Sequence, residues 1–260
     1  MNRIYFTDNP WPNGHRIVNF EWGAHFKLDE EAEKQAGLYF DLHLETADYD
    51  EEDTGEDEEE QDDEETDDWH AKIVWNNYHS CTLSSEEWDE KGFLVGSEQS
   101  PFDPEDLDGK TFTVDDLSDE ELEHLDLDTT AFDVYLLGHD ASAFHTIQFT
   151  RAQDAAFDIH WKGKLALVYA GDENFRYDFH ATISSVNFRG ISVPDELTDQ
   201  EAYELLKRFV KNPELFELQA DQDKEGLFLL TRIDAQILNH LRRPKWPRRR
   251  WFLFLMYSSF

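Results

Sequence analysis

The side chains best suited to chemistry in this sequence are histidines and aspartates in two similar sets: Asp41, His43 and His70 in the first, and Asp158, His160 and His180 in the second. Two imidazoles and a carboxylate suit zinc or iron, provided that the ligand atoms converge at about 2.0 to 2.2 Å from the ion. We therefore treat these six residues as candidate metal ligands, with a divalent metal as the only cofactor that the sequence suggests.

An alternative interpretation needs no metal. Asp41 and His43 are two residues apart, so on a strand they share the face opposite Phe40 and Leu42. Side chains on such a polar face commonly form local hydrogen bonds. The strand register decides whether His70 points toward the other two residues, and alternation along one strand does not determine it.

Other catalytic signatures are missing from the sequence. It contains no GxSxG elbow, Walker-type glycine loop, HExxH helix or GxGxxG fingerprint. The single cysteine, Cys81, excludes an intramolecular disulfide and a cysteine-based zinc cluster. We expect Cys81 to be a small core residue, and we name no catalytic residue.

The two sets lie in sequence blocks that resemble each other. Phe40–Leu44 is similar to Phe157–Trp161, and His70–Ile73 is similar to His180–Ile183, at offsets of 117 and 110 residues. The two offsets differ by seven residues, and the difference arises between the blocks, where the first copy carries a long acidic run. A tandem duplication with an insertion explains this pattern, and so does chance similarity between aromatic strands.

The elements that must position these residues are mainly strands. Alternating apolar residues predict strands near Ile4 and at 15–22, 40–44, 69–75, 132–137, 144–150, 157–161, 164–170 and 226–233. Capping boxes at Ser118 and Thr198 predict helices over 118–125 and near 199–211, with a further helical turn at 85–90. We expect an α+β fold of mostly antiparallel strands, divided into repeats at 1–127 and 128–240 and a tail at 241–260.

The charge is the most unusual property of the chain. The formal net charge is −36, and residues 45–68 hold seventeen carboxylates without a Lys or Arg. Such a segment must lie in water or against something positive. Its central carboxylates are the candidate partner-binding residues: Asp57, Glu58, Glu59, Glu60, Asp62, Asp63, Glu64 and Glu65. A basic protein is the expected partner, and the acidity argues against nucleic acid. The run lacks calcium-loop spacing, so at most it predicts weak ion binding.

The C-terminal tail has the opposite charge and ends in apolar residues. Its arginines are candidate contact residues: Arg242, Arg243, Arg248, Arg249 and Arg250. The tail could dock on the acidic body, on an anionic membrane or nucleic acid, or on a partner. We favour a terminal strand within the molecule. A secretory signal and a membrane-spanning stretch are both missing, which makes the cytoplasm the expected location.

Three functions remain open from the sequence. The first is a non-enzymatic acidic protein that binds, and in an immunity-like way neutralises, a basic partner. The second is a metal-dependent enzyme or ligand-binding protein that uses the Asp-x-His and His-Ala blocks. The third is a structural subunit that assembles through its basic tail.

Overall fold

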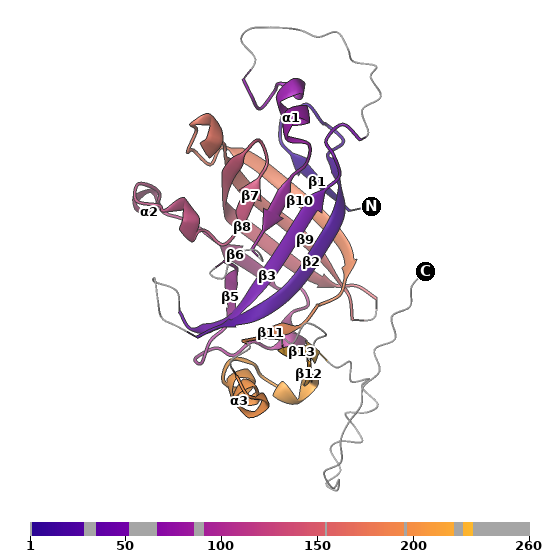
Figure 1. The fold of residues 1–260 in the computed structure, drawn as a ribbon, viewed down its shortest axis with the longest axis vertical. Coiled ribbons are helices and arrows are strands. Elements are labelled where there is room, and N and C mark those ends of the chain that lie inside the picture. The colour runs from indigo at the N-terminus through magenta and orange to yellow at the C-terminus, as the bar shows by residue number, and fades with distance from the viewer. Residues whose placement is uncertain are drawn as a thin grey trace, which may run out of the picture.

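Antiparallel strands make up most of the chain that the computed structural model describes, which comprises residues 2–28, 35–51, 67–85, 91–153, 155–194, 197–220 and 226–230. Eight strands pair in a closed ring, in the order β2-β1-β10-β9-β8-β7-β4-β3, and β3 pairs again with β2. The ring is a barrel, which Figure 1 views from the side. Its strands are β1 (Arg3–Phe6), β2 (His15–Lys27), β3 (Gly37–Thr46), β4 (Thr82–Ser84), β7 (Asp133–Tyr135), β8 (His139–Arg151), β9 (Phe157–Ala166) and β10 (Tyr177–Val186).

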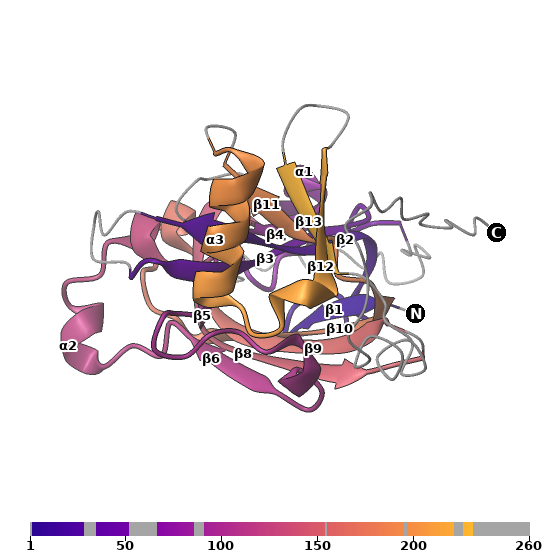
Figure 2. The ribbon, with the colours of Figure 1, turned by 90° about the horizontal axis from the view of Figure 1, so that it is seen from below.

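The remaining strands extend the sheet beyond the ring. β5 (Phe93–Gly96) pairs with β3, and β6 (Thr111–Val114) pairs with β8. β11 (Ile191–Val193) lies parallel to β2, and β13 (Gly226–Leu230) and β12 (Phe216–Ala220) follow it. Figure 2, seen from below, places these last three strands beside helix α3 (Asp199–Phe209) at one end of the barrel.

Aromatic side chains fill the inside of the barrel. Along β9, Phe157, Ile159 and Trp161 are buried, while the residues between them point outward. The ring of Trp22 packs against that of Phe149, with the centroids 4.9 Å apart. Large rings of this kind bury 150 to 250 Å² each, roughly, and they account for the density of aromatic residues in the sequence. The barrel therefore has a packed interior.

The two capping boxes predicted from the sequence are present. Ser118 caps α2 (Asp119–Leu122), and Thr198 caps α3, in both cases with the reciprocal glutamate contact. Helix α3 buries Leu205, Leu206 and Phe209 on one face, as its apolar spacing predicts. Single turns of 3-10 helix within the described residues lie at Pro104–Asp106, Leu127–Thr129, Val168–Ala170 and Pro213–Leu215.

The predicted strand at 69–75 is wrong. Residues 68–70 form a turn, and α1 (Lys72–Tyr78) follows it after Ala71. The large apolar residues Trp69 and Trp75 are both buried although they lie on a turn and a helix, and the indole Nε1 of Trp75 donates a hydrogen bond to the carbonyl oxygen of Trp69, at 2.8 Å. Trp69 is buried from the turn and Trp75 from the helix, so the burial of both needs no strand, and the alternation of apolar residues was misleading here.

This helix also bears on the similarity between the two sequence blocks. His70–Ile73 lies in a turn and the start of α1, whereas His180–Ile183 lies in strand β10. The second pair of similar blocks is therefore not a structural repeat. Strands from both predicted repeats share one sheet, because β1 pairs with β10, and residues of both contribute to a single core. The predicted tail, the helical turn at 86–90 and residues 231–233 of the last predicted strand lie outside the described residues.

Candidate functional site

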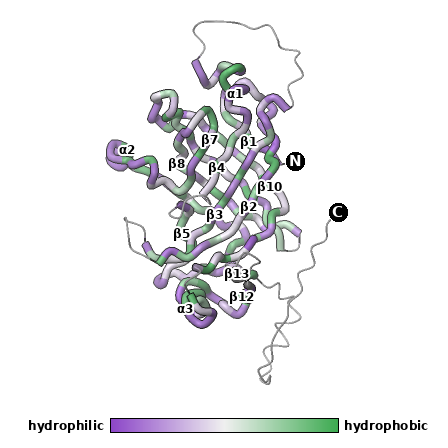
Figure 3. The backbone as a smooth tube through the Cα atoms, in the orientation of Figure 1, coloured by the Kyte–Doolittle hydropathy of each residue, from purple (hydrophilic) through white to green (hydrophobic). Residues whose placement is uncertain are grey.

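A projecting acidic segment lies between β6 and β7. It runs from residue 116 to residue 128 and contains α2, which stands away from the barrel in Figure 1 and is mostly hydrophilic in Figure 3. The segment, which we call the acidic projection, has seven exposed carboxylates: Asp116, Asp119, Glu120, Glu121, Glu123, Asp126 and Asp128. The sequence has no Lys or Arg between Lys110 and Arg151.

Local hydrogen bonds hold the projection in place. The Ser118 hydroxyl accepts from the backbone N–H of Glu121, and the Glu121 carboxylate accepts from the backbone N–H of Ser118 at 2.8 Å. The Ser118 hydroxyl also donates to the Glu121 carboxylate at 2.6 Å, and this hydrogen bond, followed by the one from the backbone N–H of Ser118, lowers the pKa of Glu121 and favours its charged form. Asp126 caps the next turn by accepting from the backbone N–H of Asp128. None of the seven carboxylates forms an ion pair with a Lys or Arg in the described part of the chain.

The first predicted set of metal ligands is divided between two places. Asp41 and His43 share the outer face of β3, as predicted. The carboxylate of Asp41 lies 2.7 Å from Nδ1 of His25, a residue of β2. His70 instead pairs with Asp67 on the surface beside α1. The wrong strand prediction for 69–75 misplaced His70. The partner of Asp41 is His25, from β2, and no residue of that strand was among the predicted ligands.

The second predicted set lies on the outer face of β9 and β10. The backbone N–H of Ser185 donates to Asp158 at 2.8 Å. His160 is exposed and lies opposite Thr182 in the register, while the ring of His180 stacks on Tyr5 with the centroids 4.8 Å apart. Across the described residues, no group of three or more His, Cys, Asp or Glu side chains is arranged to hold a metal ion. All six candidates are described, and the structure does not bring either set together.

A buried polar network surrounds Asp41 and His43 instead. Nδ1 of His43 lies 2.9 Å from the Ser84 hydroxyl, and Nε2 lies 3.1 Å from the Glu45 carboxylate. The hydroxyl of Ser85 donates to Asp41 at 3.4 Å. A serine, a histidine and a glutamate in this order resemble a nucleophile, its base and an orienting acid. However, Ser84 is only 4 % exposed, so the fold encloses its hydroxyl. This network therefore accounts for buried strand polarity and gives no access to a substrate.

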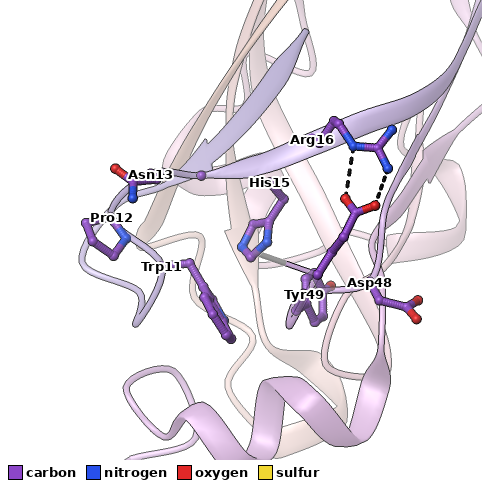
Figure 4. A pocket seen from close by; sticks show the side chains of 9 residues that line it. Trp11, Pro12, Asn13, His15, Arg16, Asp48 and Tyr49 are labelled. Carbon is purple, nitrogen blue, oxygen red and sulfur yellow. Dashed lines mark hydrogen bonds and ion pairs between the residues drawn. The ribbon is translucent and has the colours of Figure 1, made fainter. Parts of the chain in front are cut away.

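A small cavity lies near α1, at the end of the barrel opposite α3 (Figure 1). It has a volume of about 50 Å³, and Trp11, His15 and Tyr49 line it (Figure 4). Burial, with a smaller contribution from Arg3, lowers the pKa of His15 to about 4, so the ring is neutral at neutral pH. At the rim, the Arg16 guanidinium forms a two-point ion pair with the carboxylate of Glu51. The space holds a few water molecules at most.

The ends of the long acidic run belong to this part of the fold. Tyr49 is 2 % exposed, and its hydroxyl donates to the carbonyl oxygen of Leu136 at 3.2 Å. The expectation that residues 45–68 lie wholly outside the core is therefore wrong for Tyr49. Tyr49 is the one aromatic residue in the acidic run, and this was the available signal. The eight predicted partner-binding carboxylates at 57–65 and the five tail arginines lie outside the described residues.

His145, like His15, is a buried histidine that sequence reasoning did not identify. It is fully buried on β8, and the indole Nε1 of Trp161 donates to its Nδ1 at 3.2 Å. Because an indole N–H can only donate, Nδ1 must accept, and the neutral ring carries its proton on Nε2. Burial lowers the pKa of His145 to about 3. Cys81 is buried as predicted, and burial raises the pKa of its thiol.

No family model, curated protein or solved structure matches this chain. Among the described residues, no helix combines the length and the apolar character needed to cross a membrane. The class that fold and surface define is a mostly antiparallel barrel with a packed interior and an acidic surface.

Proposed function

We propose that this protein is a non-enzymatic acidic binding protein that captures a basic protein partner and, in an immunity-like way, neutralises it. The observation that carries the proposal is the acidic projection. Its seven exposed carboxylates are clustered on 13 consecutive residues and have no cationic partner among the described residues. Clustered like charges repel one another, and a cationic surface that approaches them removes that repulsion.

The rest of the molecule is consistent with this proposal. The barrel is filled by rings such as Trp22, Phe40 and Phe149, so it leaves no room for a small molecule along its axis. A net charge of −36 also produces a long-range negative field, which accelerates encounter with a cationic protein and opposes approach to phosphate backbones. The acidic run at 52–66 adds to the same field.

The two alternatives have less support. A metal-dependent activity requires convergent ligands, and Asp41 is paired with His25 while His70 is paired with Asp67. Assembly through the basic tail concerns residues outside the described part of the chain. We therefore retain only the binding function.

The test is a pull-down from native lysate at low and high salt, followed by binding measurements with the purified partner. Variant Asp116→Asn/Glu120→Gln removes two charges from the projection. Variant Glu173→Gln/Glu214→Gln removes two exposed charges elsewhere and serves as the matched control. We expect a basic partner whose dissociation constant rises with salt, and a larger loss of affinity in the first variant, about 3- to 10-fold for two charge contacts of roughly 0.3 to 0.7 kcal/mol each.

A third variant addresses the acidic run. The deletion should cover residues 52–66 alone, because Tyr49 and Glu51 contact the folded barrel. We expect it to slow association and to flatten the salt dependence. A partner whose affinity is the same at both salt concentrations and in all three variants would rule out the proposed function.

A further inference from the structure

A groove crosses the barrel wall between the short strands β5 and β6. Its volume is about 300 Å³, and its lining includes Tyr39, Phe93, Leu94, Phe112, Thr113 and Asp115. The groove exists because the wall between β8 and β3 is completed at one end only. There β7 and β4 bridge the two long strands through residues 133–135 and 82–84. At the other end, β8 carries β6 and β3 carries β5.

The two strands at the groove each have an unpaired edge in the described part of the chain. β5 pairs with β3 alone and β6 pairs with β8 alone. The backbone N–H of Gly92 donates to the carbonyl oxygen of Ala131 at 2.9 Å, which connects the two sides only at the end of the groove. Free edges present a row of backbone donors and acceptors that accepts an added strand.

The floor of the groove is aromatic. The ring centroids of Phe93 and Phe112 are 5.3 Å apart. The ring of Phe40, which is fully buried, has its centroid 5.8 Å from that of Phe93. Leu94 is 37 % exposed, which is unusual for a leucine on a strand of this fold. Phe93 and Leu94 are adjacent on β5 and face opposite sides of it, so apolar side chains on alternate positions of an added strand would cover the aromatic floor, while Leu94 would lie beside the outward-pointing positions.

The rim of the groove is acidic. Asp115 and Thr129 both line it, so the acidic projection at 116–128 leaves the barrel and returns to it at the groove. The two ends of the acidic projection, at Asp116 and Asp128, therefore adjoin the groove, and the other five exposed carboxylates extend outward from there (Figure 1). Outward-pointing cations on the remaining alternate positions of an added strand would lie near them.

We propose that this groove binds an extended basic segment of the partner protein, in which apolar and cationic residues alternate, by adding it as a strand to β5 or β6. The inference rests on the proposed function and specifies its binding mode. Backbone hydrogen bonds supply affinity in this mode, alternate side chains supply specificity, and the acidic projection selects for positive charge.

The probe is a short acetylated peptide in which Lys and Val alternate. Its matched control is the same peptide with alternate backbone amides N-methylated, which keeps the charge and the side chains but blocks strand pairing. We expect the unmethylated peptide to bind at least about tenfold more tightly, a factor that corresponds to roughly 1.4 kcal/mol. Hydrogen exchange should slow at backbone amides of β5 or β6, including those of Leu94 or Thr113.

Two protein variants locate the site. Leu94→Arg places a bulky cation in the groove, and Leu28→Arg, at a leucine with a similar exposure of 41 %, is the control outside it. Only the first should weaken binding of the peptide. Leu94→Ala provides a milder substitution if Leu94→Arg disturbs folding, and circular dichroism and thermal unfolding monitor the fold.

The other outcomes each overturn the inference. Equal binding of the methylated peptide would show charge attraction without strand addition. Slowed exchange at β5 and β6 that disappears when residues 242–260 are removed would assign the groove to the chain's own tail, and slowed exchange that increases with protein concentration would assign it to a second copy. If the native partner binds in a salt-dependent way while the peptide neither competes nor protects β5 and β6, the groove inference fails and the proposed function stands.

Discussion

At the scale of single residues, two of the buried histidines, His15 and His145, connect sequence to stability most directly. His15 is enclosed by the rings of Trp11, Tyr49 and Trp75, and His145 is enclosed by those of Phe132 and Trp161. A charged imidazolium in either place would lose its hydration without gaining a close carboxylate, since the nearest to His145 is Asp115 at 4.0 Å. Both rings are therefore held in the neutral form.

This neutrality predicts a loss of stability in mild acid. The pKa of His15 is lowered to about 4 and that of His145 to about 3, whereas the unfolded chain has the ordinary value near 6.5. Between pH 6.5 and 4 the unfolded state therefore binds more protons, and the free energy of unfolding falls as pH falls, by about 1.4 kcal/mol per pH unit for each histidine. Urea unfolding at several pH values between 6.5 and 5 measures this slope.

The control for this prediction is His15→Phe, which keeps an aromatic ring but cannot bind a proton. The slope of its free energy of unfolding against pH should be smaller than that of the wild type by the equivalent of one proton, about 1.4 kcal/mol per pH unit. The carboxylates with lowered pKa, such as Glu201, bind protons at lower pH and leave the chosen window undisturbed. Equal slopes in the two proteins would contradict a neutral, buried His15.

The sequence predicted the faces of polar residues better than it predicted their partners. Alternation correctly placed Asp41 and His43 together on the outer face of β3. The partners of Asp41 and His43 are His25 and Ser84, which belong to β2 and β4, and only the pairing register of those strands brings them close. Register depends on contacts distant in sequence, so a pattern within one strand does not contain it.

At the scale of elements, local signals identified two helices, and a periodic pattern misidentified a third. The capping boxes at Ser118 and Thr198 depend on hydrogen bonds within four residues, and both formed. α1 has no capping side chain at its start, and two buried tryptophans hold it against the barrel. The groove between β5 and β6 opens because β4 and β7 are short and bridge β3 and β8 at one end only.

The two capped helices should differ in their response to cap removal. Thr198→Ala should lower the free energy of unfolding by about 1 kcal/mol, because α3 buries Leu206 and Phe209 in the core and its first turn loses a backbone partner. Ser118→Ala is the matched control. α2 buries no residue, so its local opening should leave global unfolding almost unchanged. Urea unfolding of both variants measures the contrast, and equal losses would place α2 within the cooperative core.

At the scale of the whole molecule, charge and packing act in opposite directions. A single core of aromatic rings holds the barrel together, while a net charge of −36 repels itself across the surface. Composition predicted both the aromatic core and the excess of charge. It did not predict that β2 and β3 pair to close the sheet into a ring, because sequence patterns within each strand are the same in open and closed sheets.

Self-repulsion of this size predicts that salt stabilises the free protein. Raising the ionic strength shortens the distance over which the carboxylates repel one another, from about 30 Å at 0.01 M to about 8 Å at 0.15 M. We expect a gain on the order of 1 kcal/mol, which raises the melting temperature by about 2 to 4 °C for a chain of this size. Calorimetry in NaCl measures it, with Asp116→Asn/Glu120→Gln and the 52–66 deletion as variants whose gain should be smaller. The same salt should weaken partner binding, so opposite responses of stability and affinity to NaCl would trace both to the same surface charge. A melting temperature that falls with NaCl would contradict this prediction. It would show that attractive pairs such as Arg16 with Glu51 outweigh the repulsion.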